Sequence, residues 1–145
     1  MEESILNDIK KMLGITEDYD VFDTDIMVHI NGAIGILNQL GIGVEGFFLS
    51  TATQTWKDLL GEKELGFQNV KQYIYLKTKV VFDPPTSGFA LDSMQALIKE
   101  TEWRLNALYE VETKKKEESG CDCNALTPDQ MHSLIDLIDG GDDEP

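Results

Sequence analysis

Two adjacent prolines near the middle of the chain constrain its fold more than any other feature. Proline removes a backbone N–H donor and pushes the residue before it out of the helical region, so no helix can run through Pro84 and Pro85. An apolar helical pattern precedes them, and a second begins after Thr86-Ser87-Gly88, which offers N-cap side chains and a flexible residue. We therefore predict a helix hairpin, with one helix over 64–82 and the other over 89–109.

Shorter helices are predicted on the N-terminal side of this hairpin. The stretch 41–55 has no helical spacing, contains three glycines, and is predicted to be an irregular loop. Before it, Gly32 and Gly35 fall inside an apolar helical pattern and predict the close approach of a neighbouring backbone. Apolar residues recur at helical spacing in three segments, each followed by a glycine: 4–13, 23–40 and 54–60.

These patterns place the chain in the all-α class. We predict a small helical bundle built on the long helix hairpin, with an irregular glycine-rich loop and a separate C-terminal helix. The chain, at 145 residues, is long enough for one domain with a real core. Its predicted division is 1–112 for the helical domain, 113–126 for a charged linker, and 127–145 for the C-terminal helix and its acidic tail.

The 89–109 helix is predicted to have two contact faces. Trp103 lies about 180° from the centre of its apolar stripe, with Ala96 and Ala107 beside it. A Trp that faces water on a helix is uncommon, so we expect this face to touch something; packing beneath the first helix or the 41–55 loop is the alternative. Exposed aromatic residues in that loop, Phe47 and Phe48, would mark another contact surface. The stripe predicted to lie in the core consists of Leu91, Met94, Leu97, Ile98, Leu105 and Leu108.

The C-terminal segment begins with a strong helix signal. Thr127 fits the N-cap, Pro128 fits the first helical position, and Gln130 closes a capping box. A helix of about 12 residues is marginal in water. We therefore expect this one to be ordered only when its apolar face lies in a groove. That face consists of Met131, Leu134, Ile135 and Ile138.

Acidic residues dominate the charge of the chain. The formal net charge is −15, and the residues from Glu117 onward include nine Asp or Glu and no Lys or Arg. A surface of this sign repels the phosphate backbone, so DNA binding by phosphate neutralisation is not expected. No window approaches the roughly 18 apolar residues that a membrane span needs, and no membrane partner is predicted.

No constellation of residues predicts catalysis or a metal site. Cys121, Cys123 and His132 lack the spacing and the fourth ligand of a zinc site. The aspartates between residues 18 and 25 fail the spacing of a calcium loop. A small hydrolase built on His29 is disfavoured, because the sequence suggests no Ser or Cys partner for it. We expect no catalytic residue, no metal and no cofactor.

Several short motifs together resemble a known family. The corner Phe82-Asp83-Pro84-Pro85 and the run Glu102-Trp103-Arg104-Leu105-Asn106 are fairly specific when both occur. They are accompanied by Leu13-Gly14-Ile15, Phe22-Asp23-Thr24-Asp25-Ile26, Asn38-Gln39-Leu40-Gly41-Ile42-Gly43, Trp56-Lys57-Asp58-Leu59-Leu60-Gly61 and Val70-Lys71-Gln72-Tyr73-Ile74-Tyr75-Leu76-Lys77. With these motifs, the chain is similar over about residues 5–108 to the small head–tail connector (adaptor) proteins of tailed bacteriophages and prophages.

The resemblance implies an α-helical subunit that forms a ring with itself, expected to be a dodecamer, beneath the portal protein. The ring would extend the DNA channel, let DNA pass without specific binding, and give the next neck or tail-completion protein its platform. Members of the family have no enzymatic activity. The protein would lie in the neck of the virion, between capsid and tail, after assembly in the host bacterial cytoplasm.

Within such a ring, the second face of the 89–109 helix and the exposed aromatic residues of the loop are expected to meet a neighbouring subunit, and the resemblance gives the C-terminal helix its partner. Trp103, Ala96, Ala107, Phe47 and Phe48 are predicted to form the subunit interface. The portal is the first predicted partner of the C-terminal helix, a neighbouring connector subunit the second, and its own subunit the third. The alternative function is a helical protein-binding regulator that does not assemble into a ring. The residues predicted to dock onto the portal are Met131, Leu134, Ile135 and Ile138.

Overall fold

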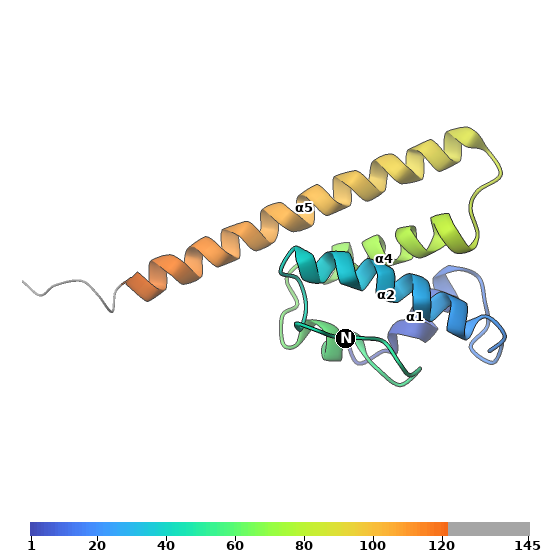
Figure 1. Ribbon diagram of the computed structural model, residues 1–145, viewed down its shortest axis with the longest axis horizontal. Coiled ribbons are helices and arrows are strands. Elements are labelled where there is room, and N and C mark those ends of the chain that lie inside the picture. The colour runs from blue at the N-terminus through green and yellow to red at the C-terminus, as the bar shows by residue number, and fades with distance from the viewer. Residues whose placement is uncertain (122–145) are drawn as a thin grey trace, which may run out of the picture. The chain divides into compact units, whose positions relative to one another are not determined.

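The computed structural model describes the backbone of residues 1–121 and the side chains of residues 1–117. This part of the chain is all-α and contains no strand, which confirms the predicted fold class (Figure 1). The chain divides into two units, Met1–Glu110 and Val111–Pro145, and the packing described below is that of the first unit. The helices are α1 (Ile5–Met12), α2 (Asp23–Gln39), α3 (Trp56–Leu60), α4 (Phe67–Phe82) and α5 (Gly88–Cys121).

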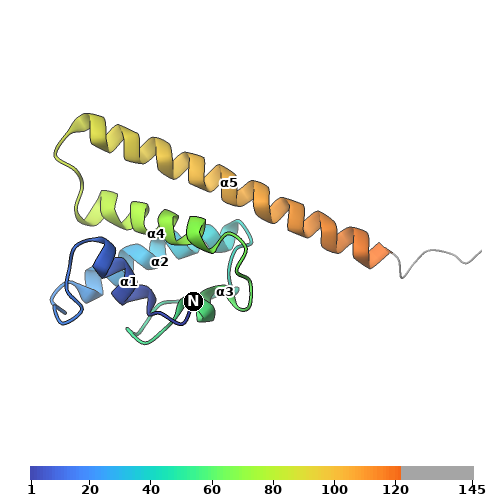
Figure 2. The same ribbon diagram turned by 180° about the vertical axis from the view of Figure 1, so that it is seen from behind.

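The core lies where α1, α2 and α4 meet. α2 and α4 pack side by side, and α1 contacts both of them (Figures 1 and 2). α4 is central, because it packs on α1 and α2 and its Tyr73 also reaches α5 through a hydrogen bond from its hydroxyl to Glu102. The buried residues of α4 are Val70, Tyr73, Ile74, Leu76 and Thr78.

Capping residues fix where the first and third helices begin. The Ser4 hydroxyl oxygen accepts a 3.3 Å hydrogen bond from the backbone N–H of Asn7 at the start of α1. Thr55 caps α3 in a capping box, in which the Asp58 carboxylate accepts a 2.7 Å hydrogen bond from the Thr55 backbone N–H. This hydrogen bond is the main reason why the pKa of Asp58 lies below its ordinary value. An isolated β-bridge joins Ser4 and Thr55, so α3 is tied to the start of α1.

The proline corner is where the sequence predicts it. α4 ends at Phe82 and α5 begins at Gly88. α5 contacts the rest of the unit over a narrower stripe than predicted, with Ile98 and Leu105 buried. Leu97 is 37 % exposed, so its assignment to the core was wrong. Leu91, Met94 and Leu108 are half-buried. Because α5 touches the rest of the unit along one line, only the residues on that line lose contact with water.

α5 does not end near Tyr109 but continues to Cys121. No glycine or proline interrupts it between Phe89 and Ser119, and acids stand four residues before lysines, as at Glu110 and Lys114. Such spacing stabilises an exposed helix. The first residues of the predicted linker are therefore helical, while the division into domains at 113 and 127 stays a prediction. Residues 122–145, which include the predicted C-terminal helix, lie outside the described residues.

The two glycines of α2 do not mark a close backbone contact. A Cβ added at Gly32 or Gly35 would meet nothing within 4 Å, and both positions are exposed, so that prediction was wrong. The tight position is Gly43, in the loop after α2, where an added Cβ would lie 3.0 Å from the carbonyl oxygen of Leu59. Gly43 also has φ of +87°, which glycine adopts without strain.

Candidate functional site

The outer face of α5, defined by Ala96, Trp103 and Ala107, is the first candidate contact surface. Spacings of seven and four residues put these side chains on one side of the helix. Trp103 is 70 % exposed and Ala96 is exposed, whereas Ala107 is half-buried. Trp103 therefore does not pack beneath α1 or the 41–55 loop. A Trp side chain this exposed on a helix offers a large apolar area to a partner.

The loop surface, defined by Val44, Phe47 and Phe48, is the second candidate. Phe48 is 64 % exposed, while Phe47 is half-buried and packs against the core. Asn31 of α2 holds the loop: its Nδ2 donates to the Leu49 carbonyl at 2.8 Å, and its Oδ1 accepts from the Leu49 N–H at 2.7 Å. The loop surface is thus fixed in place although it has no regular secondary structure.

A glutamine side chain holds the second half of the same loop. The Gln54 Oε1 accepts hydrogen bonds from the backbone N–H groups of Ser50 at 2.6 Å and Thr51 at 3.0 Å. Its Nε2 donates to the Phe48 carbonyl at 3.0 Å. Together with Asn31, Gln54 satisfies backbone groups that a loop cannot pair by itself. Sequence patterns gave no signal for these bonds, because both partners are ordinary polar residues.

The structure does not bring the two candidate surfaces together. The loop packs on α1 and α2, where the Ile5 backbone N–H donates to the Gln54 carbonyl at 3.0 Å. α5 lies on the other side of α4, as both ribbon views show (Figures 1 and 2). The five residues predicted to form one interface thus occupy two surfaces on different sides of the unit.

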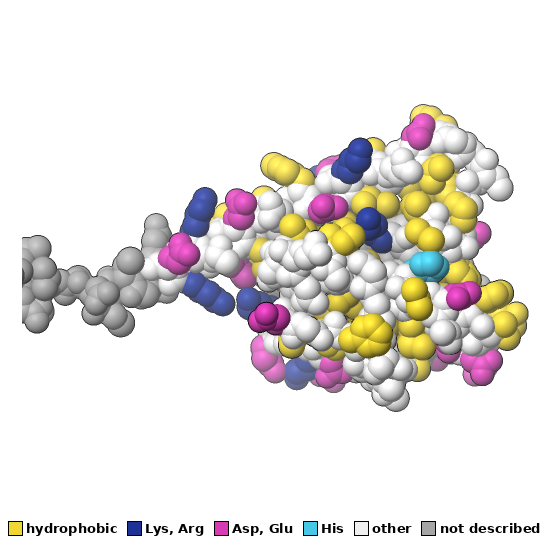
Figure 3. Space-filling model, in the orientation of Figure 1, with side chains coloured by type: hydrophobic (Ala, Val, Ile, Leu, Met, Phe, Trp, Pro, Cys, Tyr) yellow, Lys and Arg dark blue, Asp and Glu magenta, His cyan; other side chains and the backbone are white. Residues whose placement is uncertain are grey.

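A groove between α4 and α5 was not predicted. Its cavity has a volume of about 330 Å³ and is walled by Val80, Val81 and Ile98, with Lys77 and Lys99 at its edges. Gln95 and Glu102 complete the lining, and we call this set the α4–α5 groove. Hydrophobic and basic side chains lie together between α5 and α2 on this face (Figure 3).

A second hollow of about 230 Å³ shares two residues, Lys99 and Glu102, with the α4–α5 groove. It is lined further by Leu40, Trp103 and Asn106. The two hollows therefore follow one flank of α5, from the end near the proline corner to the exposed Trp103. Val81 on α4 is 62 % exposed, although it belongs to the apolar helical pattern that precedes the proline corner.

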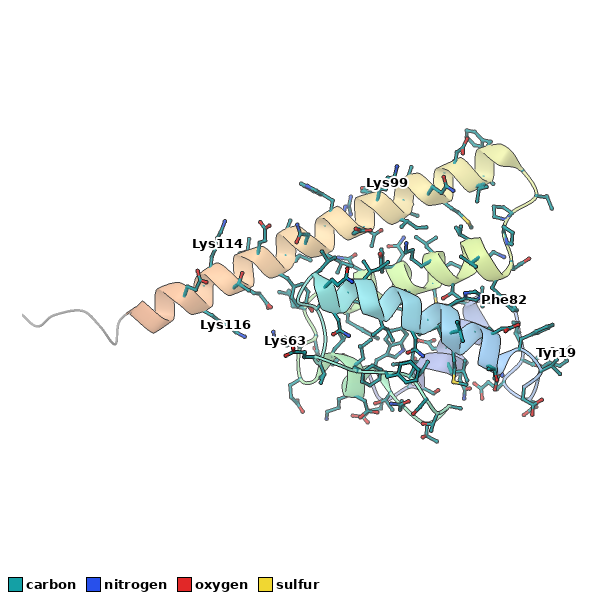
Figure 4. The ribbon with its side chains drawn as sticks, viewed as in Figure 1. Tyr19, Lys63, Phe82, Lys99, Lys114 and Lys116 are labelled. Carbon is teal, nitrogen blue, oxygen red and sulfur yellow. The ribbon has the colours of Figure 1, made fainter. Side chains whose placement is uncertain are left out.

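Three aromatic side chains form a cluster near the proline corner. The ring centroids of Tyr19 and Phe22 lie 5.6 Å apart, and those of Phe22 and Phe82 lie 5.4 Å apart. Tyr19 and Phe82 lie at the same end of the bundle (Figure 4). The cluster joins the acidic loop between α1 and α2 to Phe82 at the end of α4. Tyr19 and Phe22 thus hold this loop against the bundle.

Charged and titratable groups inside the unit form structural pairs. The Asp8 carboxylate accepts a 2.9 Å hydrogen bond from the Trp56 indole N–H and forms an ion pair with Lys71. Burial, followed by the nearby Glu102 carboxylate, raises the pKa of the Tyr73 hydroxyl far above its ordinary value. These groups tie α1, α3, α4 and α5 together.

The residues considered for chemistry are not assembled into a reactive group. His29 is half-buried on α2, and no Ser or Cys within the described residues forms a hydrogen bond with it. No cluster of three or more His, Cys, Asp or Glu suited to a metal ion occurs in the part of the chain that the structure describes. The Cys121–His132 set lies largely beyond that part. None of the described helices is both long and apolar enough to cross a membrane.

Comparison with known proteins identifies one family. No curated protein and no solved structure matches the chain. The family described as phage connector protein matches residues 5–112, a range that holds α1 to α4 and most of α5. The match covers well over half of the 145 residues and the same stretch that carries the Phe82-Asp83-Pro84-Pro85 and Glu102-Trp103-Arg104 motifs. The resemblance to head–tail connectors is thereby confirmed, and the chain belongs to the phage connector protein family.

Proposed function

We propose that this protein is a structural subunit of the head–tail connector and assembles with copies of itself into a ring beneath the portal. The observation that carries the proposal is the family match over residues 5–112. The ring, expected to be a dodecamer, extends the DNA channel and gives the next neck or tail-completion protein its platform. The role is structural, with no catalytic residue, metal or cofactor, and its place is the neck of the virion.

The separation of the two exposed surfaces supports a closed ring. Identical subunits close a ring when one surface of each copy meets a different surface of the next. The two exposed surfaces lie on different elements, Trp103 on α5 and Phe48 on the loop after α2, so each could meet the other on a neighbouring copy. A single self-complementary patch would instead favour a two-fold dimer.

The charge of the chain supports a channel that does not retain DNA. A net charge of −15 disfavours binding to a polyanion, because no counterions are released from the phosphates. DNA that must move through a connector during packaging and ejection benefits from weak contact with the wall.

Assembly on the portal tests the proposal. The full chain is mixed with the purified portal protein, and the complex is imaged by cryo-electron microscopy and weighed by native mass spectrometry. We expect a ring of connector copies seated on the portal. A chain that stays monomeric at high concentration and does not bind the portal would contradict the proposal and favour a helical regulator without ring assembly.

A further inference from the structure

The α4–α5 groove exposes apolar walls of the kind against which an amphipathic helix packs. Val81 is 62 % exposed and faces the cavity of about 330 Å³ together with Val80 and Ile98. α5 buries few side chains against α4 here, and Leu97 beside the groove is 37 % exposed. The groove therefore leaves apolar area in water on both of its walls, and a third helix packed along them would cover it.

The lining of the groove carries two lysines and one glutamate, a net positive charge. Lys99 is exposed and has no ion pair within the described part of the chain. The Lys77 ammonium lies 5.9 Å from the centre of the Tyr73 ring and has no carboxylate partner there either. The groove's own acid, Glu102, accepts the Tyr73 hydroxyl at 3.2 Å. Two lysines are thus available to carboxylates of an incoming segment.

The same chain contains a segment with the complementary chemistry. The sequence over 127–139 predicts a helix whose apolar residues recur at i, i+3, i+4 and i+7. Its charges are Asp129, Asp136 and Asp139, with no Lys or Arg. At helical spacing Asp139 borders this apolar stripe, while Asp129 and Asp136 lie on the opposite side of the helix. A purely acidic segment with Asp139 at the edge of its stripe suits an apolar groove that has Lys77 and Lys99 in its lining.

We propose that residues 127–139 of one copy dock into the α4–α5 groove of a neighbouring copy. This inference rests on the proposed assembly of identical subunits. In a closed ring, each copy offers one groove and one segment, so every groove is filled and no segment is left over. Contact with the portal, the first partner predicted from the sequence, is the competing outcome.

Photo-cross-linking in the full chain tests the proposal. Benzoylphenylalanine is placed at position 134, copies labelled with ¹⁴N and ¹⁵N are mixed before assembly on the portal, and cross-linked peptides are identified by mass spectrometry. We expect cross-links from position 134 to residues 77–81 or 95–102 of the other isotopic form. Cross-links confined to one isotopic form, or directed to the portal, would overturn the proposal.

Charge reversal separates specific docking from chance proximity. Lys99→Glu should lower the yield of these cross-links about fivefold, since it replaces an attraction to Asp139 with a repulsion. Lys11→Glu, at an exposed lysine of α1, is the matched control and should leave the yield unchanged. Asp139→Lys, combined with Lys99→Glu, should restore part of it, because Asp139 is the acid at the edge of the apolar stripe. Equal yields in all variants would contradict the charge complementarity on which the proposal depends.

The same samples distinguish failure of the inference from failure of the proposed function. Native mass spectrometry reports whether a ring has formed on the portal. A ring without cross-links to the groove overturns the inference and leaves the connector ring in place. Absence of any ring overturns the proposed function.

Discussion

The ammonium group of Lys10 lies 2.7 Å from the Asp23 Oδ1, although the Lys10 side chain is only 1 % exposed. The same ammonium donates a 2.9 Å hydrogen bond to the Glu17 carbonyl. Lys10 thus ties α1 to both the acidic loop and the first residue of α2. A buried lysine is tolerated only when such partners satisfy its charge.

Asp23→Asn should destabilise the protein by about 3 kcal/mol, because it leaves a buried ammonium without its counter-charge. Asp25→Asn is the matched control: Asp25 lies in the same first turn of α2 but is exposed, and its loss should cost less than about 0.5 kcal/mol. Urea denaturation of the two variants measures the difference. Equal free energies of unfolding would show that the Lys10 pair contributes little.

The contrast between Lys10 and Pro84 shows what the sequence could predict. Proline acts on the backbone locally, so the corner and the helices on either side of it follow from the sequence. The burial of Lys10 depends on Asp23, which is distant in sequence and lies at the start of the predicted 23–40 helix. A contact of this kind leaves no local pattern, so it could not be predicted from the sequence.

The predictions about α5 were correct where they depended on local helical spacing and wrong where they depended on contact with another helix. Helical periodicity correctly placed Trp103 on the outer side. Helical periodicity does not determine the width of the buried stripe, because this width depends on how closely α5 approaches α4. Leu97 was therefore wrongly assigned to the core, and the α4–α5 groove was not foreseen.

Asn31→Ala should release the loop surface. The substitution removes both hydrogen bonds to the Leu49 backbone and should cost about 2 kcal/mol, because a buried N–H and carbonyl lose their partner. Hydrogen exchange of the peptide that covers residues 44–52 should accelerate. Asn38→Ala, at a half-buried asparagine of the same helix, is the control. Unchanged exchange at Leu49 would contradict the anchoring role.

Stability should fall at alkaline pH through Tyr73. Its pKa in the folded protein is raised, chiefly by burial, above the ordinary value of about 10. Above that pH the unfolded chain releases the phenolic proton while the folded chain retains it, so a rise in pH favours unfolding. Tyr73→Phe removes this contribution, and it also removes the hydrogen bond to Glu102.

Urea denaturation at pH 8 and pH 11 measures this effect. At pH 8, Tyr73→Phe should be less stable than the unmodified protein by about 1 kcal/mol, from the lost hydrogen bond. At pH 11 the difference should shrink or reverse. A difference that stays constant between the two pH values would exclude Tyr73 as the source of the alkaline loss.

Ile98 and Leu97 should respond differently to truncation, although they are adjacent on α5. Ile98 is 8 % exposed, so Ile98→Ala should cost about 2–4 kcal/mol through lost burial and a new cavity. Leu97 is 37 % exposed, and Leu97→Ala should cost less than about 1 kcal/mol. Thermal and urea unfolding of both variants gives the comparison. Equal losses would mean that α5 packs more closely on α4 than the structure shows.

Trp103→Ala should weaken assembly and leave the folded subunit intact. The side chain is 70 % exposed in the subunit, so its removal opens no cavity in the core. If the outer face of α5 meets a neighbouring copy, loss of a central Trp should weaken self-association by about 30-fold, which corresponds to roughly 2 kcal/mol. Analytical ultracentrifugation with the portal measures assembly, and thermal unfolding measures the stability of the subunit.

Arg104→Ala is the control for this prediction. Arg104 is adjacent to Trp103 but lies on another side of α5, and it already pairs with Glu100 of its own helix. A Trp103→Ala chain that assembles as well as the control would place the interface elsewhere, and one that fails to fold would show that Trp103 stabilises its own subunit.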